Sequence, residues 1–467
     1  MRALAVLLAL LLGTVAHAAP VLPQVMDHGR FQGLHVYRPA GAPKSFSLLL
    51  SGDGGWAEAQ MDAMAQVLVA QGALVAGIDT QQMLAFLEAD GGDCAYAVGD
   101  LENLAHFVQA WAKLPGYLPP VLTGFSSGAT LAYGQLVQAK PGTFAAGLGL
   151  GFCPDLPLKK PLCAGEGLRF KPRKDGQGVD LLPAPKLATP FVALLGEQDS
   201  YCAAKPTQAF IDQIPVARQV LLPQVAHDYG DHGRGRAALA AAYRKLAQVP
   251  TVVATPADLG ELPVIEDHAD SDQGGSGDGG RFAVLWSGDG GWAGLDKDVA
   301  EALRTRGISV VGVDSLRYFW TARTPAGIGA DLDRIIRHYS AAWGKREVIL
   351  IGYSQGADVL PFAINHLSET TRKQVLLAAA IGLSDHAVFE FQLSNWVADN
   401  NNGPATLPEV RKLRTPFLCI YGEEEEDSIC PQLTGSRVTV AKLPGGHHFD
   451  GDYGSLAETI LKALPKP

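Results

Sequence analysis

The stretch Val348-Ile349-Leu350-Ile351-Gly352-Tyr353-Ser354-Gln355-Gly356 decides the fold of this 467-residue chain. Its four apolar residues predict a buried strand, and the helix-compatible residues 357–363 follow it. Gly-x-Ser-x-Gly between a strand and a helix is the tight turn that holds a serine hydroxyl clear of the sheet. The stretch therefore predicts a parallel α/β sheet that presents Ser354 as a nucleophile.

The chain contains this arrangement twice. Ser-Gly-Asp-Gly-Gly-Trp at 51–56 recurs letter for letter at 287–292, and Gly-Phe-Ser-Ser-Gly at 124–128 matches 352–356. In both copies apolar strands alternate with helical patterns, which indicates a mostly parallel sheet covered by helices. We therefore predict two tandem α/β-hydrolase-type domains, residues 19–254 and 255–467, with the boundary in the polar, Gly-rich region 251–280.

Partners for the serine follow in the order Ser, Asp, His, which is the order of α/β-hydrolases. The same interval of 73 residues joins Ser354 to Asp427 and Ser126 to Asp199. A base must take the serine proton, and an acid must orient that base. We predict His448 as the base with Asp427 as its acid, because His448 corresponds to the single histidine His227 of the first copy.

Two alternatives stay open at this point. His447 is the rival base. In the first copy, Ser126, Asp199 and His227 form a formally complete set, which is either a second site or a duplicate retained for structure or lipid contact.

Acyl transfer also requires hydrogen-bond donors for the developing oxyanion. We assign the backbone N–H groups of Gln355, just after the nucleophile, and Asp289, in the loop after the preceding strand. The acidic run 423–426 beside the predicted acid is either a solvated patch or a site for a substrate cation.

Composition narrows the function classes. The formal net charge of −10 argues against nucleic-acid binding, which needs a cationic surface. Residues 1–18 resemble a secretory signal peptide with a short positive start, an apolar run and an Ala-x-Ala site, so we expect export. Six cysteines suit an oxidising compartment, and Cys153 with Cys163 is the most plausible local disulfide. None has metal-site spacing, so we expect neither a metal nor a cofactor.

Two inserts interrupt the repeated pattern. Residues 384–410 contain Phe389, Phe391 and Trp396, which suits either a lid over an acyl pocket or a small private core. Residues 153–185 carry Lys159, Lys160 and the run 171–174, which suits either contact with anionic lipid headgroups or a solvated loop.

The combined motifs resemble the AcvB/VirJ family of bacterial virulence-associated proteins. The resemblance rests on Ser-Gly-Asp-Gly-Gly-Trp at 287–292, Asp-Ser-Leu-Arg-Tyr-Phe-Trp at 314–320, Gly-Tyr-Ser-Gln-Gly-Ala-Asp at 352–358 and Pro-Gly-Gly-His-His-Phe at 444–449. VirJ-type members resemble residues 258–467, and AcvB-type members resemble the whole chain. The motif containing Arg317, Tyr318 and Trp320 would lie near the pocket.

This resemblance implies a periplasmic serine esterase that contacts the membrane peripherally and hydrolyses aminoacylated phosphatidylglycerol, such as the lysyl or alanyl ester. Its nucleophile, acid and base would fall on Ser354, Asp427 and His448. Two other readings remain: an esterase or thioesterase of another substrate class, and a non-catalytic periplasmic protein that takes part in binding or secretion.

Overall fold

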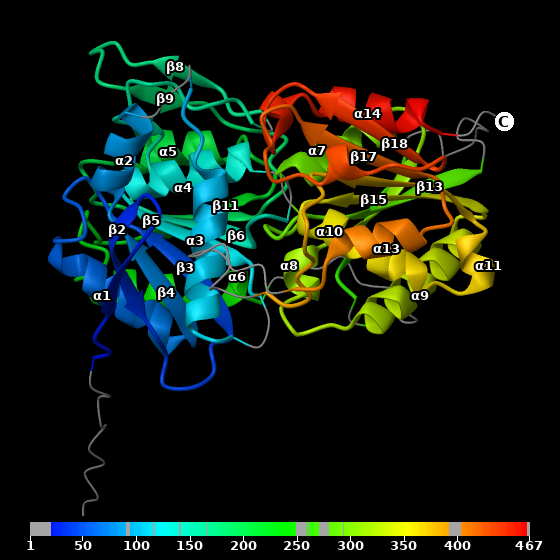
Figure 1. Cartoon of the computed structure of the whole chain (residues 1–467). Coiled ribbons are helices and arrows are strands. Elements are labelled where there is room, and N and C mark those ends of the chain that lie inside the picture. Colours follow the sequence, from blue (N-terminus) through cyan, green and yellow to red (C-terminus); the bar gives the residue numbers. More distant parts are fainter. Residues whose placement is uncertain are drawn as a thin grey trace, which may run out of the picture.

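The computed structural model describes residues 20–89, 94–114, 117–139, 142–165, 167–248, 259–260, 262–269, 280–292, 294–391 and 403–464. Two halves lie side by side, each built on its own sheet (Figure 1). The predicted signal peptide and the predicted boundary near residue 255 lie outside the described residues.

The first half contains an eight-stranded sheet in the order β1-β2-β4-β3-β5-β6-β10-β11. β1 and β2 are antiparallel to their neighbours, and all later pairs are parallel. Its strands are β1 (Gln24–His28), β2 (Phe31–Tyr37), β3 (Ser45–Leu50), β4 (Ala73–Ile78), β5 (Pro120–Phe125), β6 (Ala146–Leu150), β10 (Phe191–Gly196) and β11 (Ala217–Leu222).

The second half repeats this sheet without a counterpart of β1. Its order is β12-β14-β13-β15-β16-β17-β18, in which only β12 is antiparallel. The strands are β12 (Val264–Asp267), β13 (Arg281–Trp286), β14 (Ser309–Val313), β15 (Glu347–Tyr353), β16 (Val375–Ile381), β17 (Phe417–Gly422) and β18 (Val438–Leu443). The predicted fold class and the internal duplication are thereby confirmed at the level of strand order.

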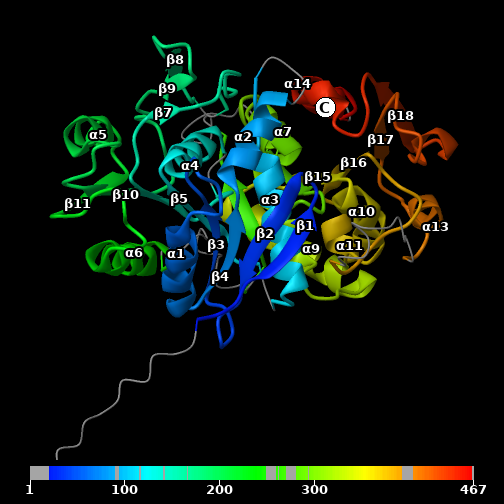
Figure 2. The same cartoon turned by 90° about the vertical axis from the view of Figure 1, so that its left-hand side faces the viewer.

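Helices cover both faces of each sheet, which is why the central strands are apolar throughout. In the first half, α1 and α6 cover one face and α2–α5 the other, as Figure 2 shows. In the second half, α7 and α14 cover one face, while α9, α10 and α13 cover the other. The helices are α1 (Ala59–Ala70), α2 (Thr80–Ala89), α3 (Val98–Trp111), α4 (Ser127–Gln138), α5 (Ala204–Ile211), α6 (Gly233–Leu246), α7 (Gly294–Arg304), α8 (Ser315–Tyr318), α9 (Pro325–Ala342), α10 (Gln355–Asn365), α11 (Glu369–Arg372), α13 (Thr406–Lys412) and α14 (Tyr453–Lys462). Two short 3₁₀ helices, η2 (Cys430–Gln432) and η3 (Phe449–Gly451), follow β17 and β18.

All six cysteines form disulfides, but the predicted Cys153–Cys163 bridge is wrong. The bridges are Cys94–Cys163, Cys153–Cys202 and Cys419–Cys430. A parallel bridge between Ala95 and Leu162 brings Cys94 beside Cys163 across 69 residues of sequence. Proximity along the chain was therefore a poor guide, because tertiary pairing decides which cysteines meet.

The two halves touch through specific polar contacts. Lys297 Nζ, on α7, donates to Thr143 Oγ1 of the first half at 2.9 Å, and the lysine is only 8% exposed. Trp320 Nε1 donates to the backbone oxygen of Leu114 at 2.5 Å, and its ring stacks on Phe391. Trp320 was expected near the pocket by resemblance; the structure shows it as a contact between the halves.

Candidate active sites

Both predicted serines occupy a strained turn between a strand and a helix. Ser126 has φ 53° and ψ −124°, and Ser354 has φ 50° and ψ −119°. A side chain on Gly352 would meet the backbone oxygen of Gly356 at 2.4 Å, so only glycine fits two residues before the serine. Positive φ at a non-glycine residue is costly and clusters at functional sites, which supports the prediction of two nucleophile turns.

The first half brings Ser126, His227 and Asp199 together. His227 Nε2 lies 3.1 Å from Ser126 Oγ, and His227 Nδ1 lies 2.8 Å from Asp199 Oδ2. A proton on Nδ1, donated to the carboxylate, leaves Nε2 free to accept the serine proton. The candidate second set is thus an assembled Ser-His-Asp triad.

Asp199 is held as a carboxylate inside the protein. Its side chain is fully buried, and it accepts hydrogen bonds from Tyr229 Oη at 3.1 Å and from the N–H groups of Tyr201 and Cys202. Burial opposes ionisation, but the hydrogen bonds from His227, Cys202 and Tyr229 outweigh it and lower the pKa of Asp199. The role of Tyr229 went unpredicted, although an aromatic residue two places after the histidine occurs in both halves.

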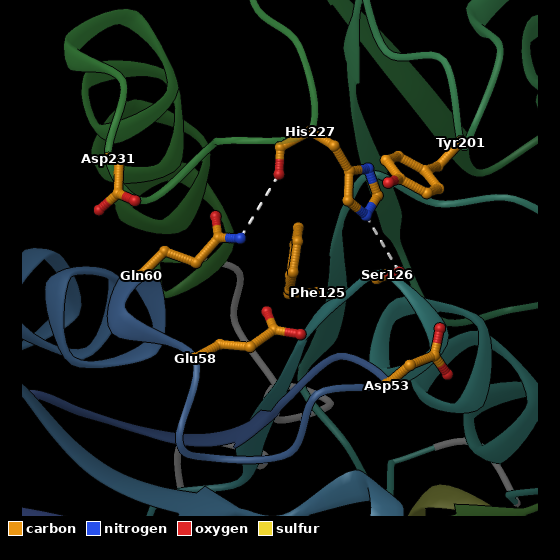
Figure 3. Close-up of a pocket in the computed structure, with 8 residues that line it drawn as sticks. All are labelled: Asp53, Glu58, Gln60, Phe125, Ser126, Tyr201, His227 and Asp231. Atoms are coloured by element: carbon orange, nitrogen blue, oxygen red, sulfur yellow. Dashed lines mark hydrogen bonds between the residues drawn. The ribbon is translucent and has the colours of Figure 1, made fainter.

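A pocket of about 510 Å³ opens over this triad. Figure 3 shows the carboxylates of Asp53 and Glu58 flanking Ser126 and Phe125, with the Tyr201 ring beside the His227 imidazole. Gln60 and Asp231 complete the lining. Gln60 Nε2 also donates to the backbone oxygen of His227, which ties α1 to the loop that carries the base.

The second half corrects the predicted acid and base. His447, the rival, is the imidazole that binds a carboxylate, and that carboxylate is Glu425: Nδ1 lies 2.5 Å from Oε1. His448 is exposed, and its Nδ1 lies 3.0 Å from Tyr353 Oη. Asp427 is exposed on the loop and, within the described part of the chain, binds neither imidazole. The structure therefore contradicts the predicted pairing of Asp427 with His448.

The acid of each half lies at a fixed distance from the glycine that ends the preceding strand. Glu425 lies three residues after Gly422, as Asp199 lies three residues after Gly196. His447 precedes the buried Phe449 by two residues, as His227 precedes the buried Tyr229. Anchoring the comparison on these strand ends and buried aromatics identifies the pair, whereas the equal interval of 73 residues was coincidental.

The same scaffold seats both imidazoles. The N–H of Ser126 donates to Leu150, and that of Ser354 donates to Ile381, each at 2.9 Å. The glycine after each acceptor packs on the imidazole: a side chain on Gly151 would lie 2.8 Å from His227 Cε1. On Gly382 it would lie 2.7 Å from His447 Cε1. His447 therefore occupies the place that His227 holds beside its serine.

One contact differs between the halves. Within the described residues, Ser354 Oγ has no hydrogen bond to an imidazole, whereas Ser126 Oγ has one. Such catalytic hydrogen bonds are often long before substrate binds. The second site thus presents an acid–base pair beside the serine turn, without the serine–imidazole hydrogen bond that the first site has in the described residues.

The charge around His447 favours its protonated form. Burial lowers the pKa of His447, but the hydrogen bond and charge of Glu425, with the charges of Asp358 and Asp289, outweigh burial and raise it. Asp358, on α10, is itself buried, and burial raises its pKa to about 7 despite hydrogen bonds from Ser384. The site is therefore distinctly acidic.

The Gly-rich loops lie where the oxyanion assignment requires them. A side chain on Gly288 would lie 3.5 Å from Ser354 Cβ, and one on Gly52 would lie 3.3 Å from Ser126 Cβ. Asp289 thus follows a residue in contact with the nucleophile, and Gln355 begins α10 directly after it. Both assigned donors stand beside Ser354 by chain position, and their role remains a proposal.

The inserts are partly structured. In 153–185, strands β7 (Asp155–Leu156), β8 (Phe170–Pro172) and β9 (Val179–Leu181) form a small sheet. Carboxylates of this insert pair with Lys171 and Arg173, which reduces the predicted basic patch. In 384–410, Phe389 packs on Phe362, while Trp396 lies outside the described residues.

Sheet order, nucleophile turns and an assembled triad together define the class of α/β serine hydrolases. The family model described as "Bacterial virulence protein (VirJ)" matches residues 44–140 and 280–466, and the chain belongs to this family. No curated protein matches the chain significantly.

Similar solved structures each correspond to about half of this chain. An alpha-beta serine hydrolase homologue from Coxiella burnetii is 17% identical, with a TM-score of 0.32, and covers 49% of this chain and 99% of its own. Est1E from Butyrivibrio proteoclasticus is 16% identical, with a TM-score of 0.33 and coverages of 48% and 96%. A soluble variant of monoglyceride lipase from Saccharomyces cerevisiae is 12% identical, with a TM-score of 0.34 and coverages of 50% and 97%.

The Glu425–His447 pair makes a testable prediction about pH. A general base must be neutral, so activity at Ser354 should fall as pH drops through a His447 pKa that lies above its ordinary value of 6.5. Glu425→Gln removes the charge that raises this pKa and leaves burial, which lowers it. We expect the acid limb of kcat/KM to move to lower pH while the plateau falls at least about 100-fold. Asp427→Asn is the matched control and should keep the wild-type profile; a shifted limb in that variant would restore Asp427 as the acid.

Proposed function

We propose that this protein is a serine esterase whose Ser354 site removes the amino acid from aminoacylated phosphatidylglycerol. The observation that carries the proposal is the Glu425–His447 pair, seated beside the Ser354 turn as the hydrogen-bonded imidazole is seated beside Ser126. The family match supports this choice of site, since it spans Ser354, Glu425 and His447 but ends at residue 140 in the first half.

The reaction uses these groups in two acyl transfers. Ser354 Oγ attacks the ester carbonyl carbon while His447 takes its proton, and Glu425 stabilises the imidazolium. The N–H groups of Gln355 and Asp289 bind the oxyanion. His447 then protonates the glycerol oxygen of the departing lipid. A water molecule, deprotonated by His447, attacks the acyl-enzyme and releases the amino acid, and His447 returns its proton to Ser354 Oγ.

The charge of the site supports an aminoacyl substrate. Asp289 lies close enough to His447 to affect its pKa, and Glu423, Glu424 and Glu426 are exposed on the adjacent loop. An amino acid ester carries an ammonium group next to its carbonyl, so carboxylates near Ser354 would attract it. A fatty ester has no such group and would gain nothing from these charges.

Export and membrane contact belong to the same proposal. Within the described residues, no helix combines the length and apolarity needed to cross a bilayer. The three disulfides suit an oxidising compartment such as the periplasm. Lys159 and Lys174 are exposed on the first-half insert and could meet anionic headgroups peripherally.

The test is a substrate comparison with the purified full chain. Vesicles containing lysyl- or alanyl-phosphatidylglycerol should yield free amino acid and phosphatidylglycerol in equal amounts, with no fatty acid released. Vesicles of phosphatidylglycerol alone serve as the control and should remain unchanged. Release of fatty acid, or turnover confined to soluble short-chain esters and thioesters, would assign the protein to another substrate class.

A further inference from the structure

The first half contains a complete catalytic arrangement that the proposed function does not use. Ser126, His227 and Asp199 are hydrogen-bonded in sequence, and only this serine contacts its imidazole in the described residues. A duplicate retained for structure alone would need none of these three side chains in register. The two hydrogen bonds that join these side chains therefore point to a catalytic function of the first half rather than to a purely structural one.

The pocket over Ser126 is built for positive charge. Its lining includes three carboxylates, Asp53, Glu58 and Asp231, and among the described lining residues there is no lysine or arginine. None of the three takes part in an ion pair within the described residues. In the part of the chain that the structure describes, the one hydrogen bond to these carboxylates is the one that Glu58 accepts from the N–H of Gly54. Their charge is therefore available to a ligand.

Tyr201 adds a second feature that suits a cation. Its side chain is 80% exposed, and its ring centroid lies 5.0 Å from that of His227. Its backbone N–H donates to Asp199 Oδ1 at 2.9 Å, which fixes the backbone of this pocket-lining residue. An exposed aromatic face attracts ammonium groups.

A neighbouring pocket of about 410 Å³ shares Asp53 and continues along α2. Its lining is partly apolar, with Leu84, Ala85 and Pro157, and also includes the charged side chains of Glu88 and Lys159. The apolar side chains of this second pocket suit the methylenes of an acyl group, whereas the carboxylates that suit its ammonium line the pocket over Ser126.

We infer that the first half is a second serine esterase centre, with Ser126 as nucleophile, selective for small esters whose acyl group is cationic. Ser126 Oγ bonds to the ester carbonyl carbon as its proton passes to His227 Nε2, and that proton then leaves with the alcohol. Water, deprotonated by His227, cleaves the acyl-enzyme, releasing the acid and restoring the serine hydroxyl. This activity is distinct from the one proposed for Ser354, because it uses a separate nucleophile and a separate acid–base pair.

The first experiment isolates Ser126 in the full-length Ser354→Ala variant. A fluorophosphonate probe should label this variant once, at Ser126, and should not label Ser126→Ala/Ser354→Ala. Because lipid hydrolysis is not the readout, the result does not depend on the function proposed for Ser354. A folded Ser354→Ala variant that takes up no label would overturn the inference.

The second experiment tests the choice of substrate. In the Ser354→Ala background, kcat/KM for lysine ethyl ester should exceed that for ethyl hexanoate, its neutral counterpart, by about tenfold or more. Asp53→Asn/Glu58→Gln preserves shape and should lower that ratio about tenfold, while Glu458→Gln, which removes one exposed carboxylate charge from α14 far from the pocket lining, should leave it unchanged. An equal ratio before and after the double change would exclude these carboxylates as the cation site.

Discussion

Replacing Ser354 with alanine should reduce hydrolysis of aminoacyl-phosphatidylglycerol by about 10⁴-fold or more. Removing a triad nucleophile leaves only binding and oxyanion stabilisation. Ser354 is partly exposed at the start of α10, and its hydroxyl makes no hydrogen bond within the described residues. The substitution should therefore barely alter the free energy of unfolding, and thermal unfolding checks this directly.

Ser126→Ala is the matched control because it removes the same hydroxyl from an equivalent turn with φ 53°. It should retain most lipid hydrolysis, since that reaction is proposed for Ser354 and Ser126 belongs to a separate triad. In cells, the Ser354→Ala protein should leave aminoacyl-phosphatidylglycerol accumulated, measured in lipid extracts. Equal loss from both substitutions would contradict the assignment of lipid hydrolysis to Ser354 alone, and loss confined to Ser126→Ala would move it to the first half.

The fold was predictable from sequence because its signals are local. The apolar runs at β3, β5, β13 and β15 each precede a glycine-rich turn, and the turn type fixes the strand-to-helix geometry. Because the sequence is duplicated, the same prediction of strand and turn applied to both halves. The nucleophiles followed for the same reason, since Gly-x-Ser-x-Gly is itself the structural element.

The acid and base could not be fixed in the same way. Asp427 and Glu425 stand on one loop, and only the path of the backbone after Gly422 decides which carboxylate turns toward the imidazole. The N–H of Gly422 donates to Glu425 Oε2 at 3.1 Å, which folds this side chain back over the strand end. Disulfide pairing failed for a related reason: Cys94 and Cys163 meet only through tertiary contact.

Replacing His447 with alanine should reduce hydrolysis at Ser354 by about 10⁴-fold, whereas His448→Ala should change it by no more than a few-fold. Of these two histidines, His447 is the one that binds a carboxylate of a largely buried side chain in the described residues: Glu425 is 10% exposed. His448 is exposed as a residue, but its ring is partly surrounded by protein, and this partial desolvation together with the neighbouring His447 lowers its pKa. Steady-state kcat/KM on aminoacyl-phosphatidylglycerol measures both variants, and thermal unfolding confirms that each is folded.

Tyr353→Phe separates a catalytic role of His448 from a local structural one. The contact between Tyr353 Oη and His448 Nδ1 at 3.0 Å is special to the second half, because the corresponding residue of the first half is Phe125. Tyr353→Phe therefore recreates the first-half environment and should match His448→Ala in its small effect on kcat/KM. If His448→Ala instead abolishes turnover while His447→Ala retains it, the imidazole that reaches Ser354 is His448, and the Glu425–His447 pair has only a structural role. Partial recovery of His447→Ala by added imidazole, with none for Ser354→Ala, would place the missing function on the His447 ring itself.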